Sequence, residues 1–148
     1  MKAVLTRVRS ASVEIDGRIN GKIGKGFLVL LGVHENDTEK EAEKIANKIC
    51  GLRIFEDADE KINLSAADAD AMSILLISQF TLFADCKSRR PGFSKAARPE
   101  KAIPLYEKVI ALCREKGFDV QTGEFGAKML VTSENDGPFT ILLDTDEL

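Results

Sequence analysis

The segment N-D-G-P-F-T at 135–140 constrains the fold most, because its Asp-Gly step is typical of a tight turn and the proline that follows is not. Apolar runs at 129–133 and 139–143 flank it, and Asp-Gly between such runs predicts a two-residue hairpin. Pro138 has no N–H with which to close that hairpin. We therefore predict a hairpin with unusual peptide geometry, with a cis Gly–Pro bond as one candidate. An irregular surface loop is the alternative.

The length of 148 residues fits one domain, spanning 1–148, which is large enough to bury a core without disulfides or metal. The three cysteines, Cys50, Cys86 and Cys113, are odd in number and widely spaced, which argues against a disulfide framework or a zinc site. Cys50 and Cys113 lie in apolar helical patterns and are expected to be inert. His34 is the only histidine. We expect no metal, no cofactor, no membrane segment and a cytoplasmic location.

Periodicity and turn residues predict one α+β domain. Asp16-Gly17 marks a hairpin over 13–19, and Thr38 with Glu41 forms a capping-box pattern before a helix. The other expected elements follow in chain order: a strand covered on both faces at 26–33, the first helix at 39–52, a buried strand at 72–77, a long loop at 85–98, a second helix marked by apolar residues 102–113 with Pro104 near its first turn, and a short strand at 119–122.

Common catalytic patterns are missing from the sequence. Residues 24–26 (G-K-G) do not have the spacing of a phosphate-binding loop, and no nucleophile elbow surrounds Ser78. Polar Ser78, Gln79 and Thr81 directly follow a buried strand, a position typical of a pocket rim with backbone N–H groups aimed inward. The alternative is that these side chains only satisfy local turn hydrogen bonds.

The loop at 85–98 is basic in a chain whose net charge is −3. Cationic side chains on such a loop suit phosphate contact, although a solvated charged surface is the alternative interpretation. Aromatic residues are too few to indicate a base-stacking platform. The basic residues are Lys87, Arg89, Arg90, Lys95 and Arg98.

The pair S-Q-F-T-L at 78–82 and N-D-G-P-F-T at 135–140 resembles the two signature motifs of the D-aminoacyl-tRNA deacylase family. The similarity extends over essentially the whole chain. Two separated motifs in the right order are more specific than either alone. Flanking segments that also match are Arg7-Val8, Ala11-Ser12-Val13, 24–26, 30–33, 52–55, 89–91 and 97–99.

The resemblance implies a homodimeric enzyme that hydrolyses the ester joining a D-amino acid, or glycine, to the 3′-terminal adenosine of tRNA. Gly137 and Pro138 match a cis Gly–Pro step that reaches into the partner's pocket and excludes L-amino acids. Arg7 and Asn135 match positions that support this loop. We accordingly expect two packed mixed or antiparallel β-sheets, barrel-like, with two main helices on one side.

The same resemblance places Phe80 and Thr81 at the reaction, where backbone N–H groups would stabilise the oxyanion. Because the sequence offers no obvious base, the 2′-hydroxyl of the terminal ribose is expected to take part; Thr81 as a nucleophile is the alternative. Rival interpretations are a non-catalytic module that binds RNA 3′ ends, a Ser- or Thr-nucleophile esterase and a purely structural dimer. Expected substrate contacts are Ser78, Gln79, Gly137, Pro138, Phe139 and Thr140, with tRNA contacts at Lys87, Arg89 and Arg90.

Two positions depart from the family pattern. Phe139 follows the Gly-Pro step where a smaller residue such as Val is common, and Thr6 precedes Arg7 where Gln is usual. Neither change falls within the Gly-Pro step or the S-Q-F-T-L motif. We expect them to affect substrate preference rather than the class of reaction.

Overall fold

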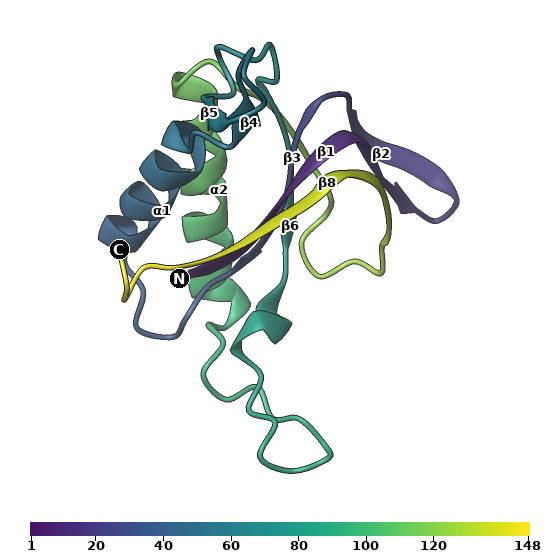
Figure 1. Ribbon diagram of the computed structural model, residues 1–148. Helices are drawn as coiled ribbons and strands as arrows, with labels where there is room; N and C mark the ends of the chain where they lie inside the picture. Colours follow the sequence, from purple (N-terminus) through teal and green to yellow (C-terminus); the bar gives the residue numbers. More distant parts are fainter.

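The computed structural model describes residues 1–148, with two helices side by side against one face of a curved sheet (Figure 1). The two termini lie close together at one end of the molecule. The elements are β1 (Lys2–Ile15), β2 (Arg18–Ile23), β3 (Gly26–Gly32), α1 (Glu39–Gly51), β4 (Phe55–Glu56), β5 (Ile62–Leu64), β6 (Ser73–Ser78), the 3₁₀ turn η1 (Phe80–Phe83), α2 (Pro99–Glu115), β7 (Asp119–Thr122) and β8 (Leu130–Asp144).

The main sheet is mixed and has six strands, in the order β2-β1-β3-β6-β7 with β8 paired to β1. The contacts of β1 with β2, β3 and β8 are antiparallel, whereas β3–β6 and β6–β7 are parallel. Strand β2 folds over toward β7, where the Asn20 side chain donates to the Thr122 carbonyl at 2.8 Å. The predicted α+β class and barrel-like sheet are confirmed, with β4 and β5 forming a second, two-stranded sheet.

Apolar side chains form two clusters because the central strands are covered on both faces. The larger cluster packs α1 and α2 against the sheet, and Phe27 and Ile45 are fully buried in it. The smaller cluster fills the inside of the curl, and includes Val8, Leu28 and Leu75. The continuous apolar runs that predicted β3 and β6 are thus explained by burial on both sides.

Both helices match the prediction, with one correction. Thr38 and Glu41 form the expected capping box of α1. Helix α2 begins at Pro99, earlier than the apolar spacing indicated, so Pro104 lies inside the helix and not near its first turn. The Asp16-Gly17 hairpin is confirmed, since both residues have the positive φ that its turn requires. No helix is long and apolar enough to cross a membrane.

The predicted hairpin at 129–143 is wrong. Residues 130–144 form one strand, β8, which runs antiparallel to β1 along its whole length. Both apolar runs therefore pair with the same neighbour, in the same direction. Strand β1 is long, and only its residues 13–15 were expected from the sequence. Because it pairs with both halves of β8, the chain at 136–139 bulges outward and does not reverse direction.

Candidate active site

The N-D-G-P-F-T segment forms a bulge in β8 opposite Arg7. Thr140 pairs with Thr6 and Asn135 pairs with Val8, so the four residues 136–139 face one residue of β1. The Gly137–Pro138 peptide bond is cis, and Gly137 has φ +129°, a conformation that favours glycine. A Cβ on Gly137 would lie 2.9 Å from the Phe139 nitrogen. The local sequence thus suits a tight excursion of the backbone.

Arg7 links this bulge to the body of the protein. Its buried guanidinium donates from Nε to the Asp136 carbonyl at 3.1 Å and from Nη1 to the Ile54 carbonyl at 2.7 Å. The same group lies over the Phe139 ring, 5.0 Å from its centroid. Asn135 contributes differently, because it pairs with Val8 in the ladder and its Oδ1 accepts from Ser133 at 2.7 Å. Arg7 therefore contacts the bulge directly, whereas Asn135 stands at its base.

The crest of the bulge is open to solvent. Gly137, Pro138 and Thr140 are exposed, and Phe139 is half-buried against Arg7. The predicted loop residues thus lie together, with Gly137 and Pro138 outward and Phe139 packed against the core.

The S-Q-F-T-L segment turns sharply at the end of β6. The backbone N–H of Gln79 continues the sheet by donating to the Leu31 carbonyl at 2.8 Å, and η1 starts at the next residue. The Gln79 side chain donates to Thr81 Oγ1 at 2.6 Å. Phe80 and Thr81 stand at the N-terminal end of η1, where backbone N–H groups have no partner within the turn. Backbone N–H groups at the start of a helical turn are of the type that can bind an oxyanion.

Two buried contacts fix this turn. Gly32 lies so close that an added Cβ would be 3.0 Å from the Gln79 carbonyl and 3.1 Å from Leu82 Cβ. Tyr106, on α2, donates its hydroxyl to the Leu76 carbonyl of β6 at 2.6 Å. Burial raises the pKa of the Tyr106 hydroxyl, so it stays protonated as a donor. The turn is therefore held by rigid elements.

The two motifs lie far apart within one chain. The turn adjoins Gly32, which pairs with Lys2, whereas the bulge lies opposite Arg7 on the same strand. Arg7 follows Lys2 by five positions along the extended strand, which is roughly 17 Å at about 3.4 Å per residue. The structure brings together the residues of each motif but does not join the motifs to each other.

The basic loop extends away from the body of the molecule (Figure 1). Lys87, Arg89 and Arg90 are all exposed, and none of them forms an ion pair. Phe93 of this loop contacts the exposed ring of Phe80 edge-on, with centroids 5.1 Å apart. The loop and the turn after β6 thus share one side of the molecule.

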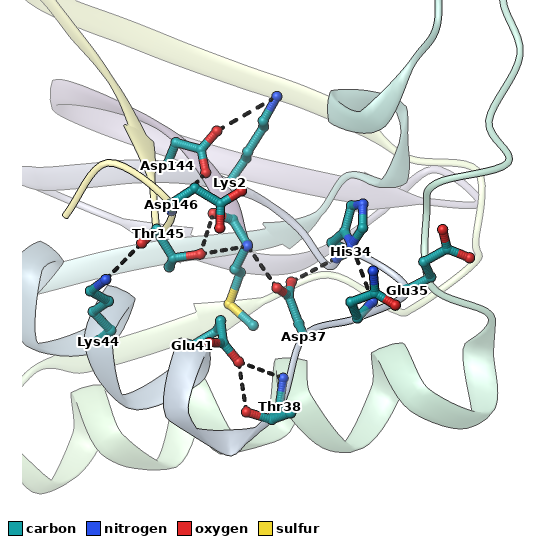
Figure 2. Close-up of polar contacts among 12 residues, drawn as sticks. Lys2, His34, Glu35, Asp37, Thr38, Glu41, Lys44, Asp144, Thr145 and Asp146 are labelled. Atoms are coloured by element: carbon teal, nitrogen blue, oxygen red, sulfur yellow. Dashed lines mark hydrogen bonds and ion pairs between the residues drawn. The ribbon is translucent and has the colours of Figure 1, made fainter.

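Sequence reasoning missed a polar network beside the turn. Asp37 and Thr145 both bind the α-ammonium of Met1, at 2.9 and 2.7 Å, and Asp37 also accepts from the His34 amide at 2.7 Å (Figure 2). Phe83 of η1 lines a cavity of about 190 Å³ together with this network. No local pattern could have indicated it, because its members come from both ends of the chain.

Comparison with known proteins decides the family. A model of the D-Tyr-tRNA(Tyr) deacylase family matches residues 4–144. The chain belongs to this family. The membership predicted from the two motifs is therefore confirmed, and the protein is a hydrolase of the deacylase class.

Relatives of this deacylase match over their full length. A D-aminoacyl-tRNA deacylase of Thermosipho melanesiensis is 54% identical over 150 residues, covering 100% of this chain and 99% of the relative. One from Thermus aquaticus is 49% identical, covering 99% and 97%.

Two solved structures share the fold of this deacylase. A c-Myc DNA Unwinding Element Binding Protein is 40% identical, with a TM-score of 0.91 and coverage of 97% of this chain and 98% of that chain. A probable eukaryotic D-amino acid tRNA deacylase has a TM-score of 0.81 and covers 96% and 97%. At 17% identity the second likeness concerns the fold alone.

Proposed function

We propose that this deacylase hydrolyses the ester bond of D-aminoacyl-tRNA and of glycyl-tRNA, releasing free tRNA and amino acid. It works as a cytoplasmic homodimer in which the 136–139 bulge of one subunit completes the pocket formed by the partner's Ser78–Thr81 turn. The observation that carries this proposal is that, within one chain, the position of β1 level with the turn and the position opposite the bulge are roughly 17 Å apart along the strand. A site that uses both motifs needs a second copy.

An exposed strand edge supports the dimer. Strand β8 pairs only with β1, so its other edge presents a row of free backbone groups, a usual template for pairing with another chain. Leu130 and Leu142 on this strand are 62% and 68% exposed. The bulge belongs to the same strand, so a copy that covers this edge also lies next to the bulge.

The bulge is suited to reading chirality by exclusion. Gly137 and Pro138 present exposed backbone atoms at the outer end of the bulge. The bulge is supported on its inner side, where Arg7 donates to the Asp136 carbonyl and packs on the Phe139 ring. A wall of fixed backbone cannot move aside at low cost, so a side chain directed at it is rejected whatever its size. D-amino acids and glycine direct only hydrogen toward such a wall.

The turn after β6 supplies the chemistry. Its Phe80 and Thr81 amides stabilise the negative charge of the tetrahedral intermediate, and the 2′-hydroxyl of the terminal ribose assists the attack of water. Thr81 positions the substrate. Its Oγ1 accepts a hydrogen bond from Nε2 of the Gln79 side chain. That amide nitrogen is not a base, so it cannot take a proton from Thr81 and make the hydroxyl a nucleophile. Lys87, Arg89 and Arg90 contact phosphates of the tRNA acceptor end.

Release of amino acid from matched D-tyrosyl-, L-tyrosyl- and glycyl-tRNA tests the function. Release from the D- and glycyl-tRNA alone is expected, with a metal chelator present. Equal release from D- and L-tyrosyl-tRNA would contradict the bulge as a chiral wall. Binding without release would instead indicate a module that only recognises RNA ends.

A mixing experiment tests the composite site. Phe80→Pro removes a backbone donor from the turn and Gly137→Val distorts the bulge, so each homodimer should lose nearly all of its turnover. In a mixed dimer one site contains both intact parts. Co-refolded 1:1 mixtures should regain roughly a quarter of wild-type turnover, because half of random pairs are mixed and each has one intact site. Mixed dimers that form but stay inactive would rule out assembly across subunits.

A further inference from the structure

A charged cavity lies beside the bulge, apart from the turn after β6. Its volume is about 350 Å³, which lies within the usual range for small-molecule sites of about 300–1,000 Å³. Segments that are far apart in the sequence form its wall: β1, the turn between β2 and β3, the β4–β5 sheet and the start of the bulge. The side chains that could contact a ligand are Arg7, Lys25, Phe55, Glu56, Leu64 and Asp136.

Two cations of this cavity lie beside one aromatic ring. The guanidinium carbon of Arg7 is 6.0 Å and the ammonium nitrogen of Lys25 is 5.6 Å from the centroid of the Phe55 ring. The side chain of Arg7 is only 6% exposed, yet its Nη2 has no hydrogen-bond partner, whereas Nε and Nη1 both donate to backbone carbonyls. Lys25 donates only to the Ala69 carbonyl, at 3.0 Å, so two of its three donors stay free. The cavity therefore has free donors for an anionic group.

Two carboxylates stand on either side of the Arg7 guanidinium. Glu56 Oε1 lies 3.9 Å from Nη2, and Asp136 Oδ2 lies 3.6 Å from Nε. Both distances are too long for a hydrogen bond, and neither carboxylate accepts one from another group of the chain. Arg9, which is exposed, approaches the other oxygen of Asp136 only to 3.8 Å. The carboxylates therefore keep lone pairs that can accept hydrogen bonds from an ammonium group.

We propose that this cavity binds a free α-amino acid with an apolar side chain. The carboxylate of the amino acid lies against the two cations, its ammonium donates to the two carboxylates, and its side chain packs on Phe55 and Leu64. An inorganic anion would meet the two carboxylates, and a simple amine would meet the two cations. A zwitterion instead meets an opposite charge at each end. The proposal does not rest on the proposed function, because the binding needs no tRNA.

Isothermal titration calorimetry with the full chain, in the absence of tRNA, tests the proposal. The probe is leucine, titrated as each enantiomer in turn, and at least one of them should bind. N-acetyl-leucine lacks the ammonium group and leucinamide lacks the carboxylate, so each should bind about tenfold more weakly or worse. No binding of leucine, or equal affinity for leucine and either analogue, would overturn the proposal. Tighter binding of inorganic phosphate than of leucine would also overturn it, because it would indicate a simple anion site.

Two variants locate the bound amino acid. Lys25→Met and Glu56→Gln each remove one charge from the cavity, and neither residue belongs to the bulge or to the turn after β6. Each should weaken the binding of leucine several-fold. Lys22→Met and Glu43→Gln are the matched controls, because both residues are exposed and do not line the cavity. In ¹⁵N–¹H spectra, leucine should shift the amide signals of Glu56 and its neighbours. Unchanged affinity in either cavity variant, or shifts confined to the turn after β6, would overturn the proposal.

Discussion

The Nε–H of Arg7 donates to the Asp136 carbonyl at 3.1 Å while Nη1 of the same side chain donates to the Ile54 carbonyl at 2.7 Å. One buried guanidinium thus joins the bulge of β8 to the segment before β4. Only a side chain with donors pointing in different directions from a rigid plane can make both contacts. The position of the bulge therefore depends on Arg7.

Arg7→Lys should loosen the bulge and weaken discrimination between D- and L-aminoacyl-tRNA. Losing one buried hydrogen bond of this kind costs about 1–3 kcal/mol, so the ratio of D to L turnover should fall by about 5- to 150-fold. Arg9→Lys is the matched control, because Arg9 is 77% exposed and only approaches the Asp136 carboxylate, at 3.8 Å. An unchanged ratio in Arg7→Lys would show that the bulge holds its position without the guanidinium.

Phe80→Pro should remove one oxyanion donor and leave the turn in place. Proline fits the first position of a helical turn, and Gln79 before it already has extended φ. Turnover should fall about 10²–10³-fold with little change in tRNA affinity. Phe80→Ala keeps the amide and is the control for losing the ring. Equal losses in the two variants would assign the effect to the side chain.

Gly32→Ala should displace the turn after β6, because the new Cβ would lie 3.0 Å from the Gln79 carbonyl. Kinetics and circular dichroism together check this prediction. We expect a large loss of turnover in a protein that still folds. Gly24→Ala is the control, since a Cβ on Gly24 meets nothing within 4 Å. Full activity in Gly32→Ala would mean that the placement of the turn is not critical.

Asp37→Asn should destabilise the whole domain. Asp37 is buried and pairs with the α-ammonium of Met1, and removing one partner of a buried ion pair costs about 3–5 kcal/mol. Urea unfolding measures this cost. Asp146→Asn, at an exposed carboxylate beside the same cavity, should change stability little. Similar midpoints for the two variants would contradict the importance of the pair.

Neutralising Arg89 and Arg90 to Gln should weaken tRNA binding in a salt-dependent way. Each lost phosphate contact reduces the slope of log affinity against log salt by about 0.7–0.9, so the double variant should lose about 1.4–1.8. Filter binding over a range of salt concentrations gives the slope. Arg18→Gln, at an exposed site in the β1–β2 hairpin, is the control. An unaltered slope would make the loop ordinary solvated surface.

Local patterns were sufficient wherever a structure depends on neighbours in sequence. The Thr38–Glu41 capping box and the Asp16-Gly17 turn need only residues a few positions apart, and both were predicted. The apolar runs of β3 and β6 also indicated strands covered on both faces. Membership of the family followed from two short motifs, because their residues are unusual for ordinary turns.

The hairpin at 129–143 could not be judged in this way. Asp-Gly-Pro between two apolar runs suits a chain reversal and a bulge equally well, since both require positive φ and interrupted pairing at the same place. Pairing with β1, more than a hundred residues away, decides between them. Long-range contacts likewise join Met1 to Asp37 and Thr145.

The sequence by itself determined the residue types of the site, the helices and the family. Only the tertiary structure decided that the turn after β6 lies level with the start of β1 while the bulge lies opposite the middle of that strand, and that Arg7 supports the bulge. The physical reason is that residue type and spacing govern local conformation. The position of one segment against another depends on which buried surfaces and backbone hydrogen bonds the whole chain can satisfy at once.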